Sequence, residues 1–284
     1  MACSANIKSR LNDSGIHRTL LIAFTPRSGS TALGRALARA GIGRPDEYFQ
    51  YPYEASEHWL GIDGGAFADR LVALASRFRQ NGVFASKLAL DHRAYLEEAI
   101  QRDRREECTL DDIFPEILWL RARRRNLVDQ AVSAFIARNS GIWHLQTDVD
   151  AGEAGPVRYD FLEILAQLMI IGAAEANWDL YFRRARISPL ELDYDDIVSD
   201  FPGTMARIHQ ALGIAHARGG APSLAQASGL ERQAEKWRDL YGAIRSQFEE
   251  DLMRIGRTDL RDRIGPDMDR WSDFFENKRW RSAS

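Results

Sequence analysis

Cysteine and histidine are scarce in this chain of 284 residues. Only Cys3 and Cys108 are present, too few for a disulfide framework or a cysteine-rich metal site. The six histidines are scattered and show no metal-ligand spacing. We therefore expect no bound metal, and a reducing cytoplasm is the expected compartment.

Long apolar runs and a large net charge are lacking as well. No run approaches the roughly 20 apolar residues of a membrane-spanning helix, and residues 1–18 form a polar leader without the apolar core of a secretory signal. A net charge of −3 argues against non-specific binding to nucleic acid or an anionic membrane. The chain is long enough for one large core, so we predict a single domain over residues 19–265 and a tail over 266–284.

Short apolar runs alternate with amphipathic segments along the chain. The run at residues 19–24 is typical of a buried parallel strand, and further strands are predicted over 83–88, 117–120 and 189–192. Helices are predicted over residues 32–40, 66–80, 93–104, 126–138, 161–184, 201–212 and 231–253. This alternation predicts an α/β fold with a parallel sheet flanked by helices.

The segment PRSGST, residues 26–31, joins the first strand to the first helix. Backbone N–H groups at a helix start attract phosphate, and a glycine lets the backbone approach it closely. Gly29 is the glycine of this segment, Ser28, Ser30 and Thr31 would add hydroxyl donors, and Arg27 would add a fixed positive charge. The lysine of a Walker A loop is missing. The alternative is an ordinary strand-to-helix turn with a Ser/Thr cap.

A second basic segment, RRRNLVDQAVS at residues 123–133, follows the third strand and opens a helix. Arg124 or Arg125 at the helix start and Ser133 two turns later could hold one phosphate together. Taken alone, a solvated basic cluster is the simpler interpretation. Two anion sites at the ends of neighbouring strands would, however, suit a nucleotide that carries both a 5′ and a 3′ phosphate group.

At these residues the chain resembles the bacterial trehalose 2-sulfotransferase family. That family combines the RSGST loop with a downstream Arg…QAVS helix and a segment of the form GxPxE(Y/F)F, here residues 43–49. Lesser likenesses are SKL at 86–88, GIW at 141–143, LDYDD at 192–196 and LERQA at 230–234. Two features depart from the family pattern: Glu235 stands where the family has aspartate, and the arginine run is denser.

The resemblance implies a P-loop nucleotide-kinase-like sulfotransferase fold and the donor 3′-phosphoadenosine-5′-phosphosulfate. The loop at residues 27–31 would hold the donor's 5′-phosphosulfate, with Arg27 meeting the charge that develops there. Arg124, or Arg125, and Ser133 would hold the 3′-phosphate. Glu47 falls where the family has its proposed catalytic base. The family often dimerises, so a homodimer is also expected.

A sugar hydroxyl becomes a good nucleophile when a carboxylate such as Glu47 removes its proton. Without the resemblance, Glu47 reads as a solvated loop acid. Lys87 could bind the sulfuryl group or the acceptor, or be a surface lysine. Trp59 and Trp143 could stack on a sugar, although core packing is more usual. The predicted acceptor is a carbohydrate or glycolipid hydroxyl, and the alternatives are a small-molecule kinase or a non-catalytic nucleotide-binding protein.

Overall fold

The computed structural model describes residues 2–50, 52, 56–62, 65–104, 109–143, 157–214, 223–228 and 238–255. Its strands are β1 (Arg18–Phe24), β2 (Val83–Leu88), β3 (Ile117–Arg123) and β4 (Leu190–Asp193). The helices of its first half are α1 (Ala2–Asp13), α2 (Ser30–Arg39), the 3₁₀ helix η2 (Glu57–Trp59), α3 (Phe67–Phe78), α4 (Leu90–Arg104), α5 (Leu110–Ile113) and α6 (Leu127–Ser140). Those of the second half are α7 (Phe161–Ala185), α8 (Tyr194–Ser199), α9 (Phe201–Leu212), α10 (Leu224–Ser228) and α12 (Arg238–Ile255).

The chain divides into two compact units, and each is described by itself. The first comprises Met1–Arg125 with Ile171–Glu231, and the second Asn126–Ile170 with Arg232–Ser284. The first unit contains the sheet, and α7 contributes to both units. Whether residues 19–265 behave as one domain stays a prediction, and the tail over 266–284 lies outside the described residues.

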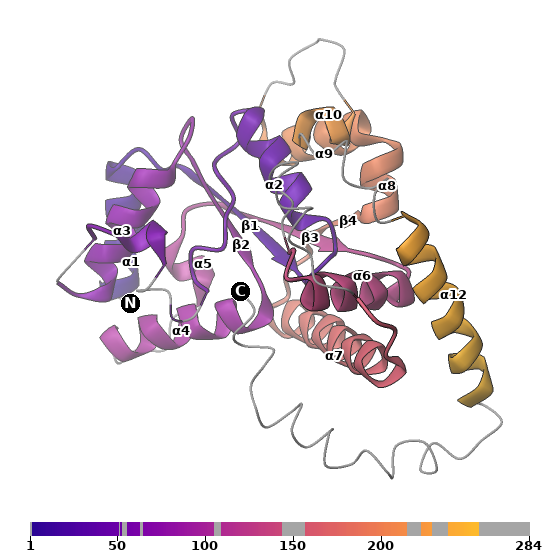
Figure 1. Cartoon of the computed structure of the whole chain (residues 1–284). Helices are drawn as coiled ribbons and strands as arrows, with labels where there is room; N and C mark the ends of the chain where they lie inside the picture. Colours follow the sequence, from indigo (N-terminus) through magenta and orange to yellow (C-terminus); the bar gives the residue numbers. More distant parts are fainter. Residues whose placement is uncertain are drawn as a thin grey trace. The chain divides into compact units, whose positions relative to one another are not determined.

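The first unit is built on a four-stranded parallel sheet in the order β2-β1-β3-β4 (Figure 1). The chain leaves β1 toward β2 on one side and later returns to place β3 on the other. The sheet therefore has a topological switch point between β1 and β3, where α/β proteins bind ligands beyond the carboxyl ends of the strands. Phe24 pairs with Ala122, so both strands end at the same level.

Apolar side chains on the two faces of the sheet form two separate cores. One face packs against α1, α3, α4, α5 and the second half of α7, and Trp119 of β3 lies among these side chains. The other face packs against α2, α8, α9 and α10. Figure 1 shows these two groups of helices on opposite sides of the strands. The predicted parallel sheet flanked by helices is thus confirmed.

The N-terminal segment belongs to this core. Residues 1–18 are predicted to form a polar leader, whereas residues 2–13 form α1. Ile7 and Leu11 are four residues apart, which puts both on one face of the helix, and both are buried. Ile16 is buried beside them.

The second unit is formed around α6 and α12. The Arg245 guanidinium of α12 lies 2.7 Å from the Asp129 carboxylate of α6, and the Tyr241 hydroxyl donates to the Asp129 carbonyl. The rings of Phe161 and Phe248 pack with centroids 5.4 Å apart, which joins the start of α7 to α12. The predicted helix over residues 231–253 corresponds to α12, and its first seven residues lie outside the described part.

Candidate functional site

A tight turn links β1 to α2. The Ser28 N–H donates to the Thr25 carbonyl at 3.2 Å, which closes a four-residue turn. Pro26 is second in this turn, and Arg27 is third with a φ of 67°. Proline followed by a residue with positive φ is the pattern of a type II turn. The left-handed conformation costs an arginine about 1–2 kcal/mol, and such strain clusters at functional sites.

The end of this turn carries donors suited to an anion. Ser28 is fully buried, and no partner for its hydroxyl exists among the described residues. Buried hydroxyls are nearly always hydrogen-bonded, and an unbonded one costs about 1–3 kcal/mol. Helix α2 begins directly after Gly29, and no side chain caps its N-terminus. An anionic oxygen can accept from the Ser28 hydroxyl and from N–H groups of the first helical turn.

Tyr194, the first residue of α8, packs on the turn. A methyl group added at Gly29 would lie 2.4 Å from the Tyr194 Cδ2, so ring and backbone are in close contact. The Arg124 guanidinium carbon lies 5.1 Å from the centroid of the same ring. Burial lowers the pKa of Arg27, Tyr194 partly offsets this shift, and Arg124 lowers the pKa further. Two guanidinium groups therefore repel one another beside the turn, and an anion there would relieve that repulsion.

The contact with Tyr194 makes Gly29 a sharp test of the turn. Gly29→Ala adds a methyl group at a φ of 85° and against the ring. We expect the free energy of unfolding to fall by about 1–3 kcal/mol, because both the strain and the clash must be absorbed. Chemical denaturation measures this loss. Gly172→Ala is the matched control, since nothing lies within 4 Å of a Cβ on this helical glycine. Equal stabilities for both variants would contradict the geometry.

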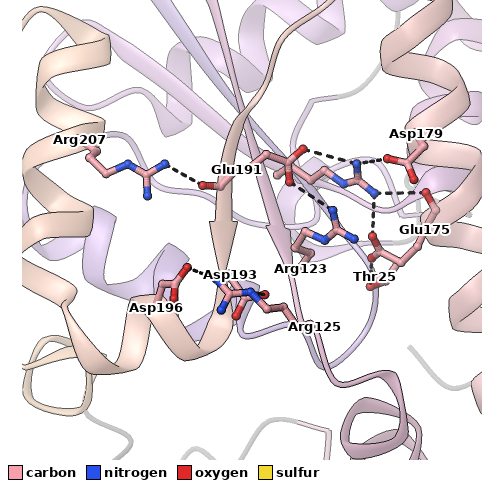
Figure 2. A network of polar contacts seen from close by, with 10 residues as sticks. Thr25, Arg123, Arg125, Glu175, Asp179, Glu191, Asp193, Asp196 and Arg207 are labelled. Atoms are coloured by element: carbon pink, nitrogen blue, oxygen red, sulfur yellow. Dashed lines mark hydrogen bonds and ion pairs between the residues drawn. The ribbon is translucent and has the colours of Figure 1, made fainter.

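Arg125 forms ion pairs with two acidic side chains (Figure 2). Its Nε lies 3.3 Å from Asp193 Oδ2, and its terminal nitrogen pairs with the Asp196 carboxylate. The Arg125 charge is therefore compensated by β4 and α8, whereas Arg124 lies over Tyr194. The choice between Arg124 and Arg125 as the 3′-phosphate ligand stays a prediction.

Glu47 lies beside Lys87 at the carboxyl end of β2. Asp46 pairs with Ser86 along the outer edge of that strand, and the Lys87 N–H donates to the Asp46 carbonyl at 2.8 Å. Lys87 Nζ donates to Glu47 Oε1 at 2.8 Å and to Thr31 Oγ1 at 3.3 Å. Lys87 is 3% exposed, so it is not a surface lysine. This buried cation links the candidate base to Thr31, in the first turn of α2.

His92 is a neighbour of this pair that sequence reasoning missed. Its Nδ1 accepts the Ala89 N–H at 3.3 Å, and its ring packs edge-on to Phe24 with centroids 6.2 Å apart. Burial lowers the pKa of His92; Asp91 and Glu47 oppose that shift, and Lys87 adds to it. His92 is therefore neutral near pH 7, which leaves Lys87 as the cation paired with Glu47.

Trp59 supports the Glu47 segment from the core. Its indole N–H donates to the Tyr48 carbonyl at 2.7 Å, and the side chain is 3% exposed. An indole buried in this way presents no face to a sugar, so its placement does not support the predicted stacking role. The bond to Tyr48 instead fixes the residue next to Glu47.

Ser133 and Trp143 lie in the second unit. Ser133 is half-buried on α6, whose N-terminus is capped by Asn126, and Trp143 is half-buried just beyond that helix. Arg124 belongs to the first unit. The joint phosphate site of Arg124 and Ser133, and a sugar contact by Trp143, therefore stay predictions.

Two features are absent from the described residues. No three histidine, cysteine, aspartate or glutamate side chains gather there in a way that could hold a metal ion. Among the helices of that same part, none combines the length and apolar character needed to cross a membrane.

Fold and turn together define the class: an α/β protein with a strand–turn–helix unit at the switch point of a parallel sheet, the arrangement in which such proteins bind anionic groups. The chain belongs to the Stf0 sulphotransferase family, whose family model matches residues 19–243. It is similar to the trehalose 2-sulfotransferase of Mycolicibacterium smegmatis, with 25% identity over 255 residues that cover 77% of this chain and 91% of the relative. The resemblance seen in the sequence is confirmed, and the chain is a sulfotransferase.

Proposed function

We propose that this sulfotransferase transfers a sulfuryl group from 3′-phosphoadenosine-5′-phosphosulfate to a hydroxyl of a carbohydrate or glycolipid. The observation that carries the proposal is the type II turn before α2, with a buried Ser28 hydroxyl that lacks a partner among the described residues. An α2 N-terminus without a side-chain cap follows it directly. Family membership favours this function over the kinase and the non-catalytic alternatives.

In this proposal the turn binds the donor's 5′-phosphosulfate. The N–H groups at the start of α2 and the hydroxyls of Ser28, Ser30 and Thr31 donate to its oxygens. Arg27 meets the charge that grows on the bridging oxygen as the bond to sulfur breaks. Arg124 and Ser133 bind the 3′-phosphate. The positive charge of Arg124 lowers the pKa of Arg27, and this repulsion supports an anionic ligand beside the turn.

Glu47 acts as the base in the proposed reaction. Its carboxylate takes the proton of the acceptor hydroxyl while the hydroxyl oxygen forms a bond to sulfur. The bond from sulfur to the bridging oxygen breaks in line, and 3′,5′-bisphosphoadenosine leaves with the electron pair. Lys87 contacts both Glu47 and Thr31 and is therefore placed to bind the transferring sulfuryl group. Positioning and charge stabilisation carry most of the catalysis in such transfers.

The acceptor class rests on the relative, whose name gives trehalose as its acceptor. The identity to this relative is 25%, so we do not assign trehalose to this chain. We propose instead the broader class of carbohydrate or glycolipid hydroxyls. Trp143 is the remaining aromatic candidate for contact with a sugar ring.

Two expectations accompany this function. A homodimer follows from the resemblance and is tested by sedimentation of the purified chain. A reducing cytoplasm follows from the low cysteine content and is tested by fractionation of cells that express the chain.

The 3′-phosphate assignment is tested by comparing two nucleotides. Arg124→Ala and Ser133→Ala should each weaken binding of 3′,5′-bisphosphoadenosine about 10- to 100-fold, since a bond to a charged group contributes about 1.5–3 kcal/mol. Binding of 5′-AMP, which lacks the 3′-phosphate, should change little. Isothermal titration calorimetry measures both affinities.

Arg125→Ala is the matched control, because Arg125 is already paired with Asp193 and Asp196. It should leave both affinities near the wild-type values. A selective loss of bisphosphoadenosine in Arg125→Ala alone would move the assignment to Arg125. Equal losses for both nucleotides in Arg124→Ala and Ser133→Ala would contradict the site.

A further inference from the structure

An ionic network contacts Thr25, the first residue of the type II turn (Figure 2). At its centre is Arg121 of β3, which is 3% exposed. Its Nη2 lies 2.8 Å from Glu175 Oε2, its Nη1 pairs with the Asp179 carboxylate, and Glu191 Oε1 lies 3.5 Å away. Burial alone would lower the pKa of Arg121, but the bonds to Asp179 and Glu175 outweigh it and raise the pKa. Arg121 therefore remains charged and fixes the position of Glu175.

Glu175 connects this network to the turn. One of its oxygens accepts from Arg121, and the other accepts the Thr25 hydroxyl at 2.7 Å. Thr25 is the first residue of the type II turn, and its carbonyl accepts the Ser28 N–H that closes it. The carbonyl of Thr25 thus takes part inside the turn, and its hydroxyl takes part outside it. Asp179 contacts the same arginine without contacting Thr25.

Helix α7 holds the end of β1 at a second point. One helical turn beyond Glu175, the Trp178 indole N–H donates to the Phe24 carbonyl at 3.3 Å. The ring of Phe24 in turn lies 5.5 Å from Lys87 Nζ. Two residues of α7 therefore hold two consecutive residues at the point where the strand becomes the turn.

A buried ion pair is a poor source of stability, since apolar residues of similar volume often stabilise a core at least equally well. Its hydrogen bonds, however, are directional and fix the groups that they join. Three carboxylates contact Arg121, one of which, Glu191, also lies 3.8 Å from Arg123 Nη1, and the best-buried of the three, Glu175, is the one that binds the turn. Fixing the geometry of the turn accounts for this arrangement better than stability does.

We propose that Glu175 is a positioning residue for the donor site, and that it sets the conformation of Arg27 and Ser28 through Thr25. The proposal rests on the proposed function, in which this turn binds the 5′-phosphate group of the donor. In this proposal Glu175 acts through Thr25 and does not itself bind the donor. Its effect should therefore fall on the 5′ side of the nucleotide, so that nucleotides with and without the 3′-phosphate lose affinity by the same factor in a variant that remains folded.

The test compares Thr25→Val, which removes the hydroxyl and keeps the shape, with Thr25→Ser, which keeps the hydroxyl. Thr25→Val should weaken both 5′-AMP and bisphosphoadenosine by the same factor, about tenfold, as expected for loss of one bond to a charged group. Thr25→Ser should bind both near the wild-type affinity. Thr19→Val is the matched control: Thr19 is buried in β1, the strand that leads into the turn, and its hydroxyl has no partner within the described ranges.

Glu175→Gln carries the same prediction if Thr25→Val does not fold, because an amide has only one oxygen to share between Thr25 and Arg121. Calorimetry on the full chain gives the affinities, and thermal melting confirms that each variant is folded. Unchanged affinities in a folded Thr25→Val or Glu175→Gln, with wild-type binding intact, would overturn this inference and leave the proposed function standing. If the wild-type chain binds neither nucleotide, the donor assignment fails and this inference fails with it.

Discussion

Glu47→Gln is expected to lower the turnover number at least about 10²-fold, the usual contribution of a general base. Glutamine keeps the shape of the side chain and can still accept from Lys87, but it cannot take the proton of the acceptor hydroxyl. Affinity for bisphosphoadenosine should stay nearly unchanged, because the base contacts the acceptor. Steady-state transfer of labelled sulfur measures the turnover number, and calorimetry measures the nucleotide affinity.

The size of this loss should depend on the acceptor. Acceptors whose hydroxyl is already acidic need less help from a base, so the loss of activity toward them should be smaller.

Asp46→Asn is the matched control: the carboxylate of this neighbouring acid accepts from the Glu47 N–H and lies 3.5 Å from the His58 ring nitrogen. Retained activity in Glu47→Gln would place the base elsewhere, with Asp46 tested first and then Glu54, which lies outside the described residues. Lost donor binding would make Glu47 structural.

Lys87→Met should lower the turnover number by about 10²- to 10³-fold, the loss seen when one donor to a developing negative charge is removed. Methionine matches the length of the lysine and fills its buried site without the charge. The same variant should also weaken donor binding, because Lys87 bonds to Thr31 in the first turn of α2, which follows the type II turn directly. This joint loss distinguishes Lys87 from Glu47 in the same two assays.

Lys8→Met is the control for Lys87→Met. Lys8 donates to the Asp111 carbonyl on the surface, and no contact of it with the turn is found among the described residues. Its variant should keep wild-type turnover and nucleotide affinity. A fully active Lys87→Met enzyme would contradict a role of the lysine in transfer and would leave it only the role of neutralising Glu47. The Glu47→Gln test would then be repeated in the Lys87→Met background.

Much of the fold could be predicted because its elements follow local patterns. Strand β2 and helix α9 have the predicted bounds, since a short apolar run and an amphipathic period determine them. Strand β3 extends three residues beyond the predicted end at residue 120, through a basic stretch that reads as a loop. Arg121 can be buried in a strand only because carboxylates of α7 compensate its charge, and no local pattern reports a partner 54 residues away.

The site could be predicted only where local sequence determines it. The composition of residues 26–31 predicts an anion turn, and the structure gives that turn a helix start and a left-handed arginine. The roles of Tyr194 and Glu175 depend on contacts across the sheet, which composition does not report. From the sequence, Lys87 could be either a ligand of the sulfuryl group or acceptor, or a surface lysine. Burial and the bond to Glu47 decide against the surface.

One measurement tests the central claim most directly. The purified chain is incubated with 3′-phosphoadenosine-5′-phosphosulfate labelled at sulfur and with a panel of carbohydrate, glycolipid and simple alcohol acceptors. The account predicts labelled sulfate ester on a carbohydrate or glycolipid hydroxyl, one bisphosphoadenosine released per ester, and no effect of added ATP. Chain that binds bisphosphoadenosine but transfers no label to any hydroxyl, or that transfers phosphate from ATP instead, would contradict it.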